Sequence, residues 1–67
     1  MGEALKKLRE NARLSQAAVA EAMGIRQSTV AMWETGGNIP RTDKLPALAK
    51  LYGCTVDDLL KDIIVEV

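Results

Sequence analysis

Small and apolar residues recur at helical spacing along most of this chain and predict a series of short amphipathic helices. In the first of them, Leu5, Leu8 and Ala12 share one face, and charged residues occupy the opposite side. The same spacing predicts five helices, over about residues 3–12, 16–23, 27–35, 43–52 and 56–61. No segment before residue 63 alternates as a strand would, so the pattern indicates an all-α domain.

Residues that favour helix ends separate these segments. Ser15 is a good N-cap for the second helix, and Gly24 and Gly53 suit the left-handed turn that closes a helix. Pro46 falls in the first turn of the fourth helix, where a missing N–H costs little. The segment Thr55-Val56-Asp57-Asp58 has the form of a capping box and starts the fifth helix.

The last residues, Ile63–Val67, form a short apolar C-terminal tail that is rich in β-branched residues. Such residues make a poor helix end and a fair strand, so we expect the tail to be extended. Helices and tail together predict one domain over residues 1–67, with no room for a separate sensor or catalytic domain.

The second and third helices follow one another across a tight turn at Gly24, which is the layout of a helix-turn-helix over residues 15–35. Val30 and Trp33 face inward on the third helix, so we expect Trp33 to belong to the core. The outward face carries small or uncharged side chains: Gln27, Ser28, Ala31 and Met32. A solvated helix face more often carries Glu and Lys, and this pattern is typical of a helix that enters the DNA major groove.

Composition argues against several other classes of protein. The chain has no histidine and a single cysteine, Cys54, so we expect no disulfide framework, no metal site and no cofactor. A lone cysteine in an apolar context fits a cytoplasmic protein. The chain shows no signal peptide and no apolar run of about 20 residues, so no membrane association is predicted. Without histidine, paired carboxylates or a phosphate-binding glycine loop, the chain is not expected to be an enzyme.

Charge is balanced overall but unevenly distributed along the chain. The net charge is zero, with nine Lys and Arg against nine Asp and Glu. Residues 1–50 carry eight of the basic and five of the acidic side chains, which gives +3, and residues 51–67 carry the compensating −3. A neutral protein can therefore present a basic face to nucleic acid, with an affinity that should be modest and sensitive to salt.

From Leu5 to Leu60 the ordered pattern resembles the lambdoid phage repressor and Cro family, the XRE-type regulators of bacteria. The matching pieces include Leu14-Ser15-Gln16, Ala20-Glu21-Ala22-Met23-Gly24-Ile25, Ser28-Thr29-Val30, Trp33-Glu34 and Val56-Asp57-Asp58-Leu59-Leu60. The resemblance implies a five-helix, lambda-repressor-like domain, a homodimer and double-stranded operator DNA as the partner. The function it implies is a sequence-specific transcriptional regulator, which we interpret as a repressor.

Four residues at the start and on the outer face of the third helix are candidates for base contact. Gln27 is the first choice, because its amide can pair with adenine through two hydrogen bonds. Ser28 can donate or accept at several bases, and Met32 can meet a thymine methyl group. Arg26 stands where the family usually has a capping Ser or Thr, and it can reach either a phosphate or a guanine.

Four other residues are candidates for phosphate contact. Gln16, at the start of the second helix, matches a family position that holds a phosphate through its side chain and a helix amide. Thr29, Asn38 and Arg41 are the further candidates. The loop 36–39 lacks the Lys and Arg that are common there in the family, so we expect weak affinity for the phosphate backbone of DNA.

Arg9 and Glu34 match a family pair that bridges the first helix to the end of the third. We interpret them as a structural ion pair that sets the angle of the third helix.

Apolar residues near the C-terminus that have no evident role in the core suggest an interface between two copies of the chain. The predicted dimer interface consists of Leu60, Ile63, Ile64 and Val65. A tail that is frayed or folded back on its own domain is the alternative. A different function class also stays open, namely an antitoxin-type module that binds DNA and a toxin-like protein partner, whose sheet the tail would extend.

Overall fold

The computed structural model of the chain describes the backbone of residues 2–63 and the side chains of residues 2–60. Within that range the chain forms five α-helices and one turn of 3-10 helix. They are α1 (Glu3–Asn11), α2 (Gln16–Met23), α3 (Gln27–Thr35), η1 (Thr42–Lys44), α4 (Leu45–Tyr52) and α5 (Val56–Ile63). The predicted all-α fold of five helices is confirmed, and no strand occurs among residues 2–63.

The fourth helix begins later than the sequence predicts. The sequence predicts a start near residue 43, at Thr42 or Asp43, either of which can cap a helix, but these residues belong to η1, and α4 begins at Leu45. Pro46 lies in the first turn of α4, where its fixed φ suits a helix. Leu45, the residue before the proline, keeps a helical φ of −62° and ψ of −43°, although a following proline disfavours this region.

The fifth helix ends later than predicted, because α5 continues to Ile63. The expectation of an extended tail is therefore wrong at this residue. The β-propensity of isoleucine is weak and depends on context, and a helix whose Leu59 is fully buried overrides it. Ile64, Val65 and the rest of the predicted tail lie outside the described residues.

The capping residues act as the sequence predicts. The Ser15 hydroxyl accepts a hydrogen bond from the Ala18 amide at 3.0 Å. Gly24 closes α2 with a φ of 68°. Thr55 and Asp58 form a reciprocal capping box, in which each side chain accepts from the other residue's amide at 3.1 Å. These local bonds satisfy amides that a helix leaves without a partner.

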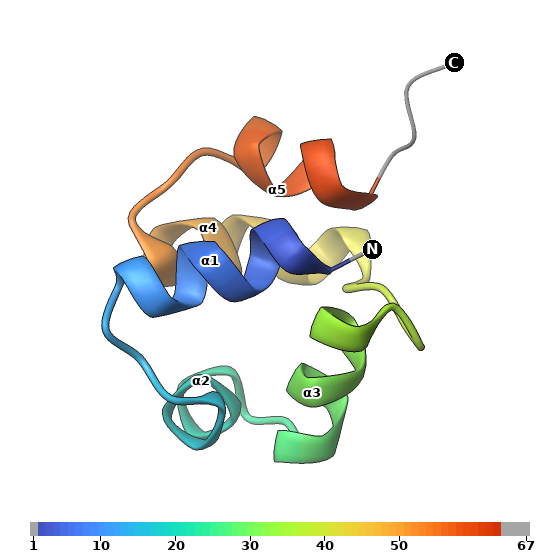
Figure 1. Cartoon of the computed structure of the whole chain (residues 1–67). Helices are drawn as coiled ribbons and strands as arrows, with labels where there is room; N and C mark the ends of the chain where they lie inside the picture. Colours follow the sequence, from blue (N-terminus) through green and yellow to red (C-terminus); the bar gives the residue numbers. More distant parts are fainter. Residues whose placement is uncertain (1, 64–67) are drawn as a thin grey trace.

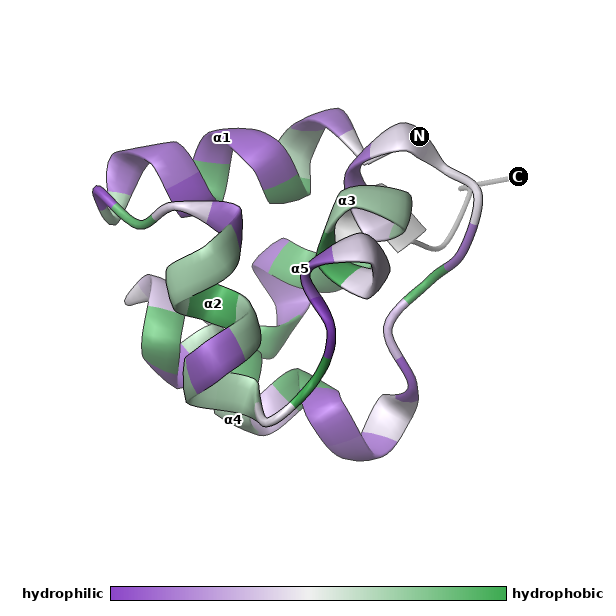
Figure 2. Ribbon diagram, turned by 90° about the horizontal axis from the view of Figure 1, so that it is seen from below, coloured by the Kyte–Doolittle hydropathy of each residue, from purple (hydrophilic) through white to green (hydrophobic). Residues whose placement is uncertain are grey.

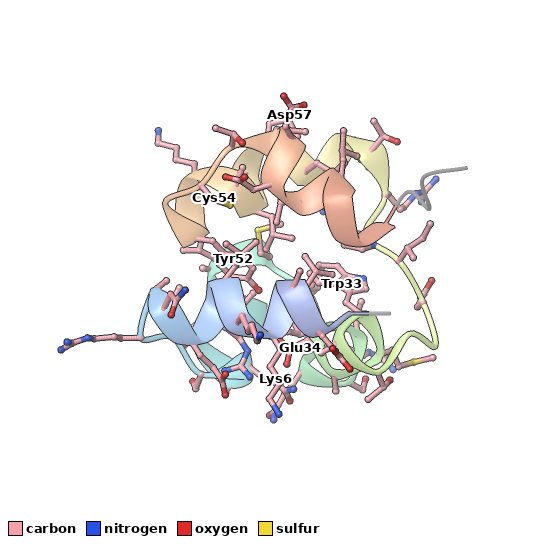
Figure 3. All side chains as sticks on the ribbon, turned by 45° about the horizontal axis from the view of Figure 1, so that its top comes forward. Lys6, Trp33, Glu34, Tyr52, Cys54 and Asp57 are labelled. Carbon is pink, nitrogen blue, oxygen red and sulfur yellow. The ribbon has the colours of Figure 1, made fainter. Side chains whose placement is uncertain are left out.

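The core draws apolar residues from all five helices. Its buried members are Leu5, Val19, Ala20, Val30, Trp33, Leu45, Leu48, Ala49, Tyr52 and Leu59. Figure 3 shows Trp33 and Tyr52 pointing into the interior beside α1. Trp33 is 5% exposed, which confirms its predicted place in the core.

The helices form two groups that meet at this core. Figure 1 shows α2 and α3 together at one end of the molecule, with α1, α4 and α5 at the other. α1 packs on α3 and α5, and α4 packs on α1, α2 and α5, so the pair α2–α3 rests on a three-helix base. Figure 2 shows hydrophilic residues over much of α1, whereas α2 is mostly apolar.

The start of the chain holds the end of α3 in place. Gly2 is buried, and its φ of 92° is one that residues with side chains rarely adopt. A Cβ atom at this position would collide with the carbonyl oxygens of Trp33 and Glu34. The approach of α1 to the last turn of α3 therefore requires glycine.

Candidate nucleic-acid interface

α3 presents two different faces, as the sequence predicts. Val30 is fully buried on the inner face, next to Trp33. Gln27 and Ser28 are exposed on the outer face, and the Met32 side chain is 44% exposed although it is apolar. α3 therefore offers an uncharged, partly apolar surface at the end of the molecule formed by α2 and α3.

The side chains at the start of α3 have no structural task within the described part of the chain. Arg26 occupies the N-cap position in an extended conformation, and its side chain makes no capping hydrogen bond. Arg26, Gln27 and Ser28 are all exposed. Three exposed polar groups with different donors and acceptors are thus available to an external ligand.

A hollow of about 260 Å³ lies behind α3, between this helix and the segment that leads to α4. Ile25 and Trp33 contribute apolar walls to it. Its polar and remaining lining residues are Thr29, Asn38, Ile39, Arg41 and Lys44. Three of the four predicted phosphate candidates therefore gather around one hollow.

Asn38 is held so that it can act as a donor at this hollow. Its backbone amide donates to the Met32 carbonyl at 3.2 Å, which ties the loop to α3. Its side-chain Oδ1 accepts from the Ile39 amide at 3.0 Å. Because the oxygen is engaged, the Nδ2 group is left to donate outward.

Sequence reasoning missed Lys44, which lines the hollow together with Arg41. The Lys44 amide donates to the Arg41 carbonyl at 2.9 Å across η1. One turn of 3-10 helix places residues three apart on the same side. The signal was a spacing of three between two basic residues, but Arg41 lies before the predicted fourth helix, so no helical face was expected to carry both.

Gln16, the fourth phosphate candidate, lies apart from the residues that line this hollow. It is the first residue of α2 and is half-buried. Its Nε2 group donates to Oε1 of Glu34 at 3.1 Å. The start of α2 is thus connected to the end of α3 by a hydrogen bond between side chains.

Arg9 and Glu34 form a close, two-point ion pair. Arg9 Nε lies 2.6 Å from Oε2 of Glu34, and Arg9 Nη2 donates to Oε1 at 3.0 Å. The two side chains are only 10% and 4% exposed. Arg9 also donates through Nη1 to the Leu14 carbonyl at 2.8 Å, so the guanidinium binds both the end of α3 and the turn before α2.

Three ionisable side chains of the described residues have raised pKa values. The hydrogen bonds to Glu34 raise the pKa of Arg9 above its usual value, although its burial acts in the opposite direction. Burial raises the pKa of Tyr52 to about 12, so this phenol is neutral at physiological pH. Burial likewise raises the pKa of the Cys54 thiol, which disfavours the reactive thiolate.

Other kinds of site find no support in the described residues. No group of three or more His, Cys, Asp or Glu side chains is close enough together there to hold a metal ion. No helix among these residues is long and apolar enough to cross a membrane.

A helix-turn-helix that exposes uncharged polar side chains, with cations beside the end of its second helix, is the architecture of DNA-binding domains. The model of the helix-turn-helix family matches residues 5–59 of the chain. The chain belongs to this family, in its XRE or Cro/C1 type.

Two curated relatives match over nearly the whole chain. The HTH-type transcriptional activator BcrR of Enterococcus faecalis is 31% identical over 58 residues, which are 87% of this chain. Repressor protein C2 of Salmonella phage P22 is 33% identical over 61 residues, which are 91% of this chain. The chain spans 28% of the length of each relative. No solved structure gives a significant match.

Proposed function

We propose that this domain recognises a specific double-stranded DNA operator by placing α3 in the major groove. The observation that carries the proposal is the outer face of α3, where the side chains of Gln27 and Ser28 are exposed and make no hydrogen bond within the described residues. Gln27 would read adenine, Ser28 a neighbouring base, Met32 a thymine methyl group, and Arg26 a guanine or a phosphate.

Phosphate contacts on either side of α3 would fix its register in the groove. Thr29, Asn38, Arg41 and Lys44 line one hollow behind α3, and they would meet one stretch of backbone. Gln16 would meet another stretch at the start of α2, where first-turn amides lack acceptors within the helix. With few cations involved, binding should be modest in strength.

We further propose repression as the regulatory direction and the bacterial cytoplasm as the place of action. One relative is named a repressor and the other an activator. Occupation of an operator can block transcription without any further contact, whereas activation requires an additional surface. Repression is therefore the function that the described residues can perform on their own.

The experiment that tests base recognition is selection of binding sites from random duplexes, followed by substitution of Gln27. Gln27→Ala should cost about 1–3 kcal/mol on the selected operator and little on random DNA, because it removes a base contact. Thr35→Ala, at the exposed far end of α3, is the matched control and should bind as the parent does. An equal loss on every duplex would remove Gln27 from base recognition.

We also propose that the chain binds as a homodimer through α5 and the residues that follow it. Leu60 is half-buried in the single chain, so part of its apolar surface is left for a partner. Two-fold symmetry would place two recognition helices about 34 Å apart, one turn of DNA. Ile63 lies in the last turn of α5, and the other proposed interface residues, Ile64 and Val65, follow it in the sequence.

Sedimentation equilibrium of the full chain and of an Ile64→Asp/Val65→Asp variant tests the dimer. The parent should dimerise and select a palindromic operator, and the variant should be monomeric. Parent and variant that are both monomeric at high micromolar concentration would contradict the proposal. A monomer that binds DNA only together with a second protein would instead favour the antitoxin-type module.

A further inference from the structure

The carboxylate of Glu34 joins three helices through hydrogen bonds. It belongs to the last turn of α3, receives two bonds from Arg9 of α1, and receives one from Gln16 of α2. Figure 3 shows Glu34 beneath α1, and α3 packs on both α1 and α2. Gln16, the residue proposed to hold a phosphate, is therefore hydrogen-bonded directly to α3, the proposed recognition helix.

The carboxylate of Glu34 determines the orientation of the Gln16 side-chain amide, that is, which of its nitrogen and oxygen atoms faces Glu34. An ionised carboxylate only accepts hydrogen bonds, so the amide must turn its Nε2 group toward Glu34, at 3.1 Å. One N–H of that group is used there. The second N–H has no partner among the described residues, and neither do the backbone amides of Gln16 and Ala17 in the same first turn.

Arg9 makes this arrangement compatible with a nearby phosphate. An isolated carboxylate beside the DNA backbone would repel it, because both carry negative charge. The contact of 2.6 Å between Arg9 Nε and Glu34 Oε2 compensates the carboxylate charge within the protein. The raised pKa of Arg9 keeps the guanidinium charged at any physiological pH. What reaches the surface is a neutral donor of fixed orientation.

We propose that Glu34 is a positioning residue, which orients the Gln16 amide so that its second N–H binds one DNA phosphate. The inference rests on the proposed operator binding and adds how one of its contacts is made. Because Glu34 lies in the last turn of α3, the same hydrogen bond ties this phosphate contact to the angle of the recognition helix.

The test combines protein variants with DNA in which single phosphates are neutral. Methylphosphonates are placed one at a time along the selected operator, and affinity is measured for the parent, Gln16→Met and Glu34→Gln. Gln16→Met removes the donor and leaves both Arg9 bonds to Glu34 in place. Glu34→Gln lets the Gln16 amide turn over, because a glutamine can donate as well as accept.

The parent should lose roughly tenfold in affinity at one phosphate near the start of α2. Gln16→Met should bind the unmodified operator roughly tenfold more weakly, and methylphosphonate at that phosphate should cost it nothing more. The affinity of folded Glu34→Gln should likewise depend little on whether that phosphate is replaced by methylphosphonate. Because no cation is removed by Gln16→Met, its salt dependence should equal that of the parent.

Nuclear magnetic resonance of the Gln16 side-chain amide gives a readout that lost stability alone would not produce. In the free parent its two protons should differ strongly in shift and exchange slowly, and in folded Glu34→Gln this difference should collapse. A folded Glu34→Gln variant that keeps the parent's sensitivity to the methylphosphonate would overturn the positioning role. A parent that binds no duplex preferentially would instead overturn the proposed function.

Discussion

The start of α2 and the hollow behind α3 are both proposed to meet DNA phosphates, but they are built in different ways. At the start of α2, Gln16 is neutral, half-buried and held by Glu34. At the hollow, Arg41 is exposed and carries a charge that no hydrogen bond in the described residues restrains. The first region supplies orientation, and the second supplies charge.

This difference would explain how a chain of zero net charge binds the proposed DNA partner, which is a polyanion. A neutral donor that is already oriented loses little conformational entropy on binding, so it contributes without adding positive charge. A mobile cation contributes through counterion release, which is strong in low salt and weak in high salt. A domain that combines both kinds of contact should keep part of its affinity at higher salt.

The largest expected effect is the loss of the ion pair that supports the first region. Glu34→Ala should lower the free energy of unfolding by about 3–5 kcal/mol, because it leaves the Arg9 guanidinium buried without its partner. Chemical denaturation of the parent and the variant measures the change. Glu21→Ala removes an exposed acid of α2 and serves as the control, with an expected change below about 0.5 kcal/mol. An unchanged midpoint for Glu34→Ala would show that the pair contributes nothing to stability.

A smaller loss is expected when the end of α3 is pushed away from α1. Gly2→Ala should destabilise the fold by about 2–3 kcal/mol, since the new methyl group meets the carbonyl oxygens of Trp33 and Glu34 and the backbone has a positive φ. Gly24→Ala has a similar φ of 68° but open space around it, so it should cost only about 1 kcal/mol.

Thermal unfolding of the two glycine variants separates steric from conformational cost. If the two variants melt at the same temperature, the close approach of Gly2 to α3 has no energetic weight. If Gly2→Ala melts lower and also weakens operator binding at a temperature where it is folded, the support of α3 by the chain start contributes to DNA recognition.

Local capping along the chain could be predicted from the sequence, whereas the contacts that build the first region could be predicted only in part. Ser15, Gly24 and the box at Thr55 and Asp58 act through neighbours within three residues, so their roles follow from local chemistry. The contact between Arg9 and Glu34 spans 25 positions, and it could be expected only because both residues match a family pattern. The bond from Gln16 to Glu34 depends on how α2 and α3 pack, and no local signal predicts it.

The second region was harder still to predict. The sequence indicates Thr29, Asn38 and Arg41 separately and contains no signal that places them together. They converge because the Asn38 amide caps the end of α3 through the Met32 carbonyl, which turns the loop back toward the helix. Lys44 joins them because a 3-10 turn replaces the first turn of the expected fourth helix.

The smallest effect, a change in salt dependence, distinguishes the two regions most directly. Arg41→Ala and Lys44→Ala should each weaken binding a few-fold on all duplexes, and each should flatten the slope of log K against log salt by about one unit. Gln16→Met should weaken binding and leave the slope unchanged, because it removes no cation. The measurement is a salt titration of affinity on the selected operator and on random DNA.

Lys50→Ala is the matched control for charge, because Lys50 lines a separate hollow between α2 and α4, together with Ala22, Met23, Ala47 and Leu51. Loss of any lysine lowers the net charge by one, so a general electrostatic effect would flatten the slope for Lys50→Ala as well. A slope that changes only for Arg41 and Lys44 places the phosphate at the hollow behind α3. Equal slopes for all three variants would mean that these cations act at a distance, and the division between an orienting region and a charged region would then fail.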